Sequence, residues 1–476
     1  MTNIHKTLPF GFFEGVFLLL LSSVSLFLLT TEYYIFAFVP VILILAFLFL
    51  IRSPQAGYYV IVFLIPFAAY RGLAGDSKLF NISWIFGFFL LGFLLYRFVI
   101  ARDSVRRINS NLWPFIAVYF VISMLSALMS PYPQTAFQNI GLSLAGYFFI
   151  LLSIFFISSP GVYAKTLPLI LVASITINSF LGIAGNVFGI DMFAVEHETF
   201  TRSMGAAVDP NNFSLMAIFS LPFIAHYLFT SKERNKRILL IFMLLINLLG
   251  IVFTYSRGGA LILSIIFPVL FAMHLFSLKP KLFGFVLSLI GFIAVIIIAF
   301  IPDAYWERQQ SLFGGRKDFS ISRRTAYLHV GLDVLKDNPV LGSGPGTFRD
   351  IFSESKYAEF FYREGFTKRR FAHNTYMEVL AGTGIAGAIF FMVLLWRAMK
   401  NFRTSMKNFQ EAGDLWKLHL TRAYLLSFIS LLIYLGIFSD MYHKYLLLSL
   451  AVSHAALTVS QKIKLERSGA DALSAK

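Results

Sequence analysis

Apolar residues recur along this chain in runs of about twenty, and short polar or basic segments separate the runs. A helix of that length spans about 30 Å, the thickness of the hydrocarbon layer of a membrane. A membrane β-barrel would instead show short segments of alternating polarity. The pattern therefore predicts an all-α polytopic membrane protein with about 12–14 transmembrane helices.

The apolar runs predict helices along the whole chain. We place them at residues 10–29, 34–51, 57–70, 82–100, 113–130, 138–158, 166–190, 212–230, 238–254, 258–277, 282–301, 375–396, 420–438 and 442–459. The run at 57–70 is short, so that segment is either spanning, re-entrant or partly buried. A tight turn around Ser439 and Asp440 separates the last two runs.

One connection, residues 302–374 between the eleventh and twelfth predicted helices, is much longer than the others. It contains several aromatic residues and a helical stretch from Ser322 to Asn338, so we expect it to fold as a small cap. Long structured loops usually carry function. The chain then divides into about eleven spans within 1–301, the loop subdomain 302–374, about three spans within 375–460, and a tail at 461–476.

Composition and charge give this arrangement an orientation. The chain is 58% hydrophobic and 13% charged, which excludes an ordinary soluble enzyme. In a soluble protein, the formal charge of +16 would suggest nucleic acid as a partner. Here the basic residues gather on alternate connections, as the positive-inside rule requires of cytoplasmic loops. We therefore expect a lipid bilayer and not nucleic acid as the partner, both termini in the cytoplasm, and the long loop on the outer face.

The sequence lacks the common motifs that bind a nucleotide or a metal. The run Gly342-Ser-Gly-Pro-Gly346 has no lysine, so it is most simply a turn and not a phosphate loop. No His-Glu-x-x-His motif is present, and the chain has no cysteine. We expect neither a metal nor a cofactor. An enzyme on the outer face has no nucleotide supply, so it must use a substrate that is already activated, such as a lipid-linked pyrophosphate.

Arg257 lies in Thr254-Tyr-Ser-Arg-Gly-Gly259, the tight outer connection between two predicted spans. One interpretation is an interfacial arginine that snorkels to lipid headgroups. Against it, the two glycines keep the surroundings bare and let a ligand approach the backbone. An arginine inside a helical bundle is a functional candidate, and its planar guanidinium binds phosphate oxygens bidentately. We therefore predict that Arg257 binds an anion.

The long loop carries further candidates. Arg323 and Arg324 open its helical stretch, where a solvated helix face is the simpler interpretation for either residue alone. His373-Asn374 lies directly before the twelfth span, where it is either a polar helix cap or the source of a general base. A helix N-terminus disfavours the imidazolium, so we expect a neutral ring that accepts a proton near pH 7.

The segment Asp209-Pro-Asn-Asn212 opens the eighth predicted span. An aspartate followed by a proline is typical of a helix start, so capping and a turn explain the segment most simply. Asn211 and Asn212 remain candidates for substrate binding.

Taken in order, these segments resemble the superfamily of bacterial inner-membrane glycosyltransferases that comprises O-antigen ligases and O-antigen polymerases. The family's Arg-x3-Leu element is matched by Arg257-Gly-Gly-Ala-Leu261. Its arginine, proline and glycine-rich loop is matched by Arg324-Thr-Ala-Tyr-Leu, followed by Asp337-Asn-Pro-Val-Leu-Gly-Ser-Gly-Pro-Gly-Thr-Phe348. Its His-Asn-x9-Gly-x2-Gly signature is matched by His373-Asn374, nine residues, Gly384, two residues and Gly387. Asp209-Pro-Asn-Asn212 resembles the Pro-Asn that usually lies upstream. Members often have fewer helices than we predict here.

The resemblance implies an inverting, metal-independent transfer of a glycan from undecaprenyl pyrophosphate, with the active site facing the periplasm. In such an enzyme His373 would accept the proton of the acceptor hydroxyl as that hydroxyl attacks the anomeric carbon. Arg257 and Arg324 would hold the pyrophosphate and stabilise the charge that develops on it. Arg323 would replace Arg324 if the register of the match is shifted by one residue.

Three functions remain open from the sequence. In an O-antigen ligase the acceptor would be lipid A–core, and in an O-antigen or exopolysaccharide polymerase it would be another lipid-linked glycan. A polysaccharide transporter or flippase would show inverted repeats, broken helices and buried ion-binding acids, none of which is clear in this sequence. We favour the ligase.

Overall fold

A computed structural model of the chain describes residues 53–67, 82–197, 200–207, 209–275, 305–306, 319–361 and 367–474, with isolated positions between 15 and 30 and at 284, 288 and 291. The helices predicted at 10–29, 34–51 and 282–301 lie outside these residues, apart from the isolated positions. Two compact units make up the chain, namely Met1–Ile61 with Ile82–Asp103, and Val62–Asn81 with Ser104–Lys476. The site described below lies within the second unit.

The described residues are almost entirely helical, as the apolar runs predicted. The first unit holds α4 (Ile82–Leu95) and most of α3 (Pro54–Phe63). The long helices of the second unit are α5 (Trp113–Leu128), α6 (Pro133–Ile157), α7 (Leu167–Phe188), α8 (Pro210–Thr230), α9 (Arg234–Phe253), α10 (Arg257–Leu275), α16 (Thr375–Glu411), α17 (Leu415–Leu435) and α18 (Lys444–Ser474). Seven helices in the described part, α6 to α9 and α16 to α18, are long and apolar enough to cross a membrane. The chain is therefore an all-α polytopic membrane protein.

Each predicted helix that falls within the described residues has an observed counterpart, with two kinds of difference. The run at 57–70 is broken, because α3 ends at Phe63 and a 3-10 turn with Pro66 at its centre follows. Proline lacks the amide hydrogen that would continue an α-helix. In contrast, α16 and α18 continue far beyond their apolar runs, and Lys464 in the tail bonds Glu411 at the end of α16 over 2.6 Å.

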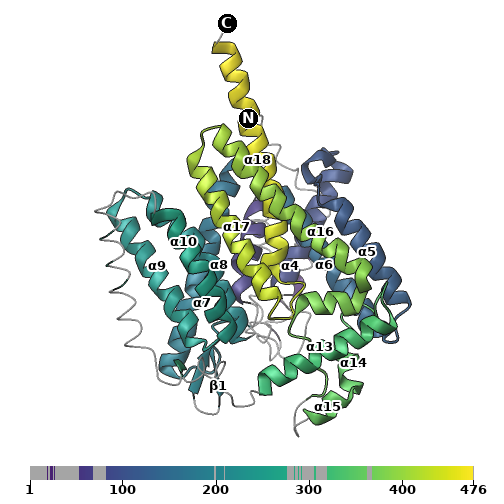
Figure 1. Ribbon diagram of the computed structural model, residues 1–476. Helices are drawn as coiled ribbons and strands as arrows, with labels where there is room; N and C mark the ends of the chain where they lie inside the picture. The colour runs from purple at the N-terminus through teal and green to yellow at the C-terminus, as the bar shows by residue number, and fades with distance from the viewer. Residues whose placement is uncertain are drawn as a thin grey trace. The chain divides into compact units, whose positions relative to one another are not determined.

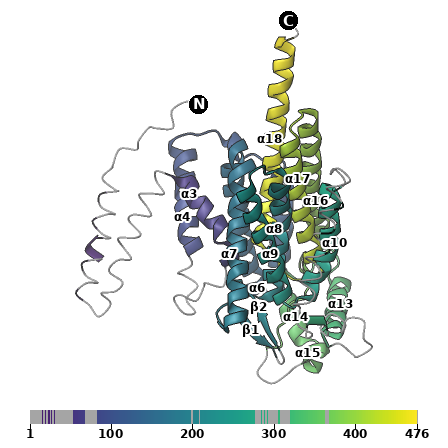
Figure 2. The ribbon, with the colours of Figure 1, turned by 90° about the vertical axis from the view of Figure 1, so that its left-hand side faces the viewer.

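Helices α8, α16, α17 and α18 form the centre of the second unit (Figure 1). Helix α18 packs against α16 and α6, and α17 packs against α8. The three C-terminal helices lie alongside one another in both views (Figure 2). Because successive helices run in opposite directions, the starts of α8, α10, α16 and α18 meet at one end of the bundle. We call this the loop end.

The long connection before α16 folds at the loop end. Its helices are α13 (Phe319–Asp337), α14 (Phe348–Glu354) and α15 (Lys356–Phe360), and α13 coincides with the predicted helical stretch. The aromatic side chains of Tyr327, Phe348 and Phe352 are buried against Ala372 and Ala381. Burial of each large apolar side chain contributes about 1.5–3 kcal/mol, so the cap has an apolar core of its own on the start of α16. The described part of the connection therefore folds onto the start of α16, and a subdomain over the whole of 302–374 stays a prediction.

A small antiparallel hairpin lies between α7 and α8, where no strand was predicted. Its strands are β1 (Ala194–His197) and β2 (Phe200–Ser203). Strands of only four residues show too few alternating polar and apolar positions for the sequence to predict them.

Helix α16 is interrupted at Gly384, where φ is 64° and ψ is −169°. The glycine-rich loop that precedes α14 packs onto this break. The amides of Ser343 and Gly344 donate to the carbonyls of Ala381 and Gly382, each over 2.9 Å. Backbone groups that the broken helix cannot satisfy internally are therefore satisfied by the loop.

The same loop approaches α16 too closely to carry side chains. Gly342 has φ of 68°, and a Cβ atom there would lie 2.5 Å from the Ala381 carbonyl oxygen. The prediction of a simple turn for this run was therefore incomplete. The glycine-rich loop and the segment around Gly384 form one joint, which fixes the cap on α16, and Gly384 lies eleven residues after His373.

Candidate active site at the loop end

One aromatic side chain, Phe438, lies close to three segments that carry predicted site residues. The guanidinium carbon of Arg324 lies 6.0 Å from the centre of the Phe438 ring. The imidazole centre of His373 lies 6.4 Å from it, in an edge-on arrangement. A Cβ atom added at Gly258, the neighbour of Arg257, would lie 3.0 Å from the same ring. The structure thus brings three segments that are far apart in the sequence together around one phenyl group.

Arg257 is the first residue of α10 and is half-buried. Hydrogen bonds fix the turn Thr254–Ser256 that precedes it. The Thr254 carbonyl accepts a hydrogen bond from Arg202 over 2.8 Å, and the Gly259 amide donates to the Ser256 hydroxyl over 3.1 Å. A helix start carries partial positive charge from its backbone amides, so α10 and the Arg257 guanidinium together favour an anion.

Arg323 and Arg324 lie in the first turns of α13, the former half-buried and the latter exposed. Both act electrostatically on His373, and Arg324 acts more strongly. They are therefore not simply a solvated helix face, because their charge reaches the predicted base.

His373 lies just before α16, with φ of 49°, and its ring centre lies 5.8 Å from that of Tyr327. Part of the residue stays exposed. Burial of the rest, followed by the positive charges of Arg324 and Arg323, lowers the pKa of His373 to about 4. The ring is therefore neutral near pH 7, as predicted. Desolvation and neighbouring arginines are the cause, whereas the sequence argument relied on the helix N-terminus.

Asp209 caps α8, as the simpler interpretation of its segment predicted. Its carboxylate accepts from the amides of Asn211 and Asn212, over 2.8 and 3.1 Å. The same carboxylate favours the charged form of His373 and so opposes the arginines. Asp209 therefore belongs to the electrostatic surroundings of the site as well as to the helix start.

The two asparagines after Asp209 hold other elements in place. The Asn211 carboxamide oxygen accepts from the Ser256 hydroxyl over 2.9 Å, in the turn that precedes α10. The Asn212 oxygen lies 2.9 Å from Nε2 of the buried His443, whose Nδ1 accepts from the Tyr445 amide. Burial lowers the pKa of His443 to about 3, so the ring is neutral and Nε2 donates to Asn212. These contacts favour positioning roles, and substrate binding by either asparagine stays a prediction.

The backbone on both sides of His373 is fixed. The Ala372 amide donates to the Glu378 carboxylate over 2.8 Å. Asn374 caps α16 by accepting from the backbone amide of Met377, and its own amide donates to the Ser439 hydroxyl over 3.2 Å. The cap interpretation of Asn374 is confirmed, and a direct contact with substrate stays a prediction.

Sequence reasoning missed Phe438 and Arg370. Arg370 acts electrostatically on the Tyr327 hydroxyl and adds a further positive charge that acts on His373. Nothing in the sequence distinguishes Phe438 from the many other phenylalanines of the apolar helices. The basic run Lys368-Arg-Arg370, so close to His373 in the chain, was the available signal for Arg370.

The loop end of this helical membrane protein therefore gathers arginines and a neutral imidazole around one aromatic ring. Guanidinium groups bind the oxygens of phosphates and carboxylates, and a neutral imidazole accepts a proton. Within the described ranges, no cluster of three or more His, Cys, Asp or Glu side chains is placed to hold a metal ion.

Comparison with protein families identifies the type of domain. Residues 239–392 match the family model described as O-antigen ligase, about a third of the chain. The match runs from α9 through α10 and the cap into α16, so it contains Arg257, Arg324 and His373. This part of the chain is therefore similar to the O-antigen ligase family, which confirms the resemblance. A comparison with curated proteins finds no match.

Proposed function

We propose that this chain is an O-antigen ligase-like glycosyltransferase of the bacterial inner membrane. It transfers a glycan from undecaprenyl pyrophosphate to a hydroxyl of lipid A–core. The observation that carries the proposal is the approach of Arg324, His373 and Gly258, the neighbour of Arg257, to the same Phe438 ring. Two cations suit a pyrophosphate, and a neutral imidazole suits the proton of a hydroxyl.

In the proposed reaction, the acceptor hydroxyl gives its proton to His373 while its oxygen forms a bond to the anomeric carbon of the donor sugar. The bond between that carbon and the pyrophosphate oxygen breaks, and undecaprenyl pyrophosphate leaves with the electron pair. Attack from the face opposite the leaving group inverts the anomeric centre. Arg257 and Arg324 stabilise the charge that develops on the pyrophosphate, so the reaction needs no metal ion.

A bound donor would also strengthen the base. Arg324, one of the two residues that receive the pyrophosphate, is among the arginines that lower the pKa of His373. An anion between them and the ring compensates their charge and so favours the imidazolium. Donor binding therefore raises the pKa of His373 towards the operating pH, where a general base is most effective.

We place the loop end in the periplasm and both termini in the cytoplasm. Helices α16 and α18 both start at the loop end, so their basic C-terminal parts lie at the opposite end of the bundle. These parts include the segments 397–417 and 462–467. The positive-inside rule assigns the basic end to the cytoplasm.

A polymerase of the same superfamily would use these residues with a lipid-linked glycan as the acceptor. The glycans that accumulate in a deletion strain separate the two functions. Long polymers on undecaprenyl pyrophosphate, together with bare lipid A–core, are the expected result. Single repeat units on the lipid would contradict the proposed acceptor and indicate a polymerase, and units trapped on the cytoplasmic face would indicate a flippase.

A further inference from the structure

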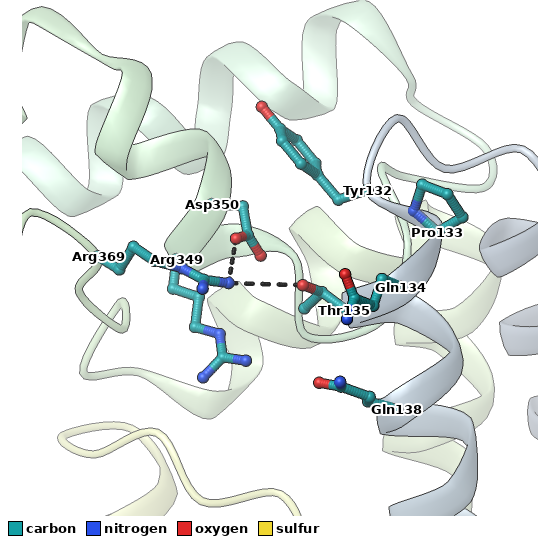
Figure 3. Close-up of a pocket in the computed structure, with 8 residues that line it drawn as sticks. All are labelled: Tyr132, Pro133, Gln134, Thr135, Gln138, Arg349, Asp350 and Arg369. Carbon is teal, nitrogen blue, oxygen red and sulfur yellow. Dashed lines mark hydrogen bonds and ion pairs between the residues drawn. The ribbon is translucent and has the colours of Figure 1, made fainter.

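A pocket of about 440 Å³ lies at the loop end, beside the segment that leads to His373 (Figure 3). The proposed reaction uses none of its polar residues. They are Tyr132, Gln134, Thr135 and Gln138 at the start of α6, Arg349 and Asp350 in α14, and Arg369.

Asp350 is the most buried charged group of this pocket, at 8% exposure. One carboxylate oxygen pairs with Arg369, whose guanidinium also reaches the Thr135 hydroxyl at 3.5 Å. The other oxygen, Oδ2, is buried and has no hydrogen-bond partner among the described residues. A buried carboxylate oxygen is costly to leave unsatisfied, so a donor from a ligand would complete it.

Arg349 is likewise incompletely satisfied. Its Nε atom is buried without a partner in the described part of the chain. Its guanidinium lies 5.7 Å from the centre of the Phe371 ring. Figure 3 shows this guanidinium directed away from Asp350, so the two groups do not neutralise each other. The pocket therefore presents both an acceptor and a donor.

The opposite wall supplies neutral polar groups. Gln134 and Gln138 are exposed on the first turns of α6, and each carboxamide both donates and accepts. Tyr132 adds an aromatic ring, and Figure 3 shows its hydroxyl directed away from the two glutamines. A carboxylate, a guanidinium, two carboxamides and an aromatic ring together suit the hydroxyl groups and apolar ring faces of a sugar.

We propose that this pocket is a saccharide-binding subsite, which holds a sugar of one of the two glycans away from the reacting carbon. The inference rests on the proposed function. Arg349 interacts electrostatically with Glu378, which holds the Ala372 amide next to His373. Arg369 lies four residues before His373. A sugar in the pocket thus contacts residues that position the backbone of the base.

The test uses the full-length protein in proteoliposomes, with undecaprenyl-pyrophosphate-linked glycan as donor and lipid A–core as acceptor. The variants are Gln138→Ala and Arg349→Gln. The control is Lys336→Gln, an exposed residue of α13 whose partner is Asp333. Each pocket variant should raise the KM for one substrate about tenfold, with kcat within about twofold, because hydrogen bonds to a bound sugar are lost. The control should change neither quantity.

The substrate whose KM rises identifies the source of the sugar. A higher KM for the acceptor assigns the pocket to the core oligosaccharide, and a higher KM for the donor assigns it to the transferred glycan. Saturation-transfer NMR with each oligosaccharide, released from its lipid, should show the same preference. If both variants keep wild-type KM values and wild-type binding, the pocket is not a saccharide subsite. Gln138 is exposed, so misfolding does not obscure the result.

The two proposals fail in different ways. His373→Ala should abolish transfer and still bind the released oligosaccharide as the wild type does. A fully active His373→Ala variant would overturn the proposed function, whereas the binding result at Gln138 and Arg349 would stand on its own.

Discussion

At the scale of single residues, the balance of charges around His373 sets the pKa of its imidazole and therefore its strength as a base. Arg324, Arg323 and Arg370 disfavour the imidazolium, and Asp209 favours it. The neutral ring is thus ready to accept a proton, and its strength as a base depends on what neutralises the arginines.

Replacement of His373 or Arg257 by alanine should abolish most of the transfer activity while the protein still inserts into the membrane. Loss of a general base costs about 10²–10⁴-fold in rate, and loss of a group that stabilises developing charge costs about 10²–10³-fold. Transfer of a labelled glycan measures the rate, with Lys336→Gln as the control. Near-normal turnover by either variant would exclude that residue from catalysis.

Arg324→Gln should raise the pKa of His373, because it removes the stronger of the two adjacent positive charges. Arg323→Gln should raise it less. NMR titration of ring-labelled histidine would follow the change from the wild-type value of about 4. Inorganic pyrophosphate should also raise the pKa in the wild type. An unchanged or lower pKa in Arg324→Gln would contradict this electrostatic picture.

The acid limb of kcat/KM should lie near pH 4 in the absence of bound donor, because only the neutral form of His373 accepts a proton and its pKa is about 4. The acid limb of kcat should lie at higher pH, since the bound donor raises that pKa. Rates measured from pH 3.5 to 8 would locate both limbs, about one unit or more apart. A kcat limb at lower pH than the kcat/KM limb would show that the donor does not compensate the arginines.

The sequence singled out Arg257 and His373 from their places in an apolar chain, whereas the predicted role of Arg324 came from the family resemblance. It did not predict that Phe438 lies between their segments, because contacts between segments far apart in the sequence leave no local pattern. For the same reason, the sequence did not predict that Asn211 bonds Ser256 before α10 or that Asn212 bonds His443.

At the scale of elements, the joint between the glycine-rich loop and the break in α16 holds the cap. The apolar runs predicted the helices well, since about 20 apolar residues have few alternatives in a membrane. They could not predict the break, because a single glycine in an apolar helix is usually tolerated. Only the paired backbone of the two segments shows why Gly384 is needed.

Gly384→Ala should destabilise the protein by at least about 2 kcal/mol, because alanine is strained at positive φ and its Cβ would clash with the Val340 carbonyl. Gly141→Ala is the matched control, since nothing lies within 4 Å of a Cβ at that helical position. The control should be neutral or stabilising by up to about 1 kcal/mol. Thermal unfolding in detergent measures both, and equal midpoints would contradict the proposed joint.

At the scale of the whole molecule, the basic segments that the sequence places far apart lie at the same end of the helix bundle, opposite the loop end. The loop end carries the site, and the opposite end carries the basic ends of α16 and α18. Composition predicted a membrane protein, and the alternation of basic connections predicted which loops share a face. The directions of α8, α16 and α18 agree with that assignment.

The absence of cysteine makes this orientation simple to test. Lys336→Cys and Lys407→Cys place single thiols at opposite ends, on side chains that are 75% and 78% exposed. A membrane-impermeant maleimide should label the first from the periplasm and the second only after the inner membrane is permeabilised. The reverse pattern would invert the proposed topology.

The most direct test of the proposed function is the formation of a new glycosidic bond by the purified protein. Proteoliposomes that contain the wild-type chain, lipid A–core and an undecaprenyl-pyrophosphate-linked glycan should yield glycosylated lipid A–core and free undecaprenyl pyrophosphate in equal amounts, without added metal or nucleotide. His373→Ala should yield neither. Movement of the glycan across the bilayer without a new bond, or equal product from His373→Ala, would contradict a transferase that uses this site.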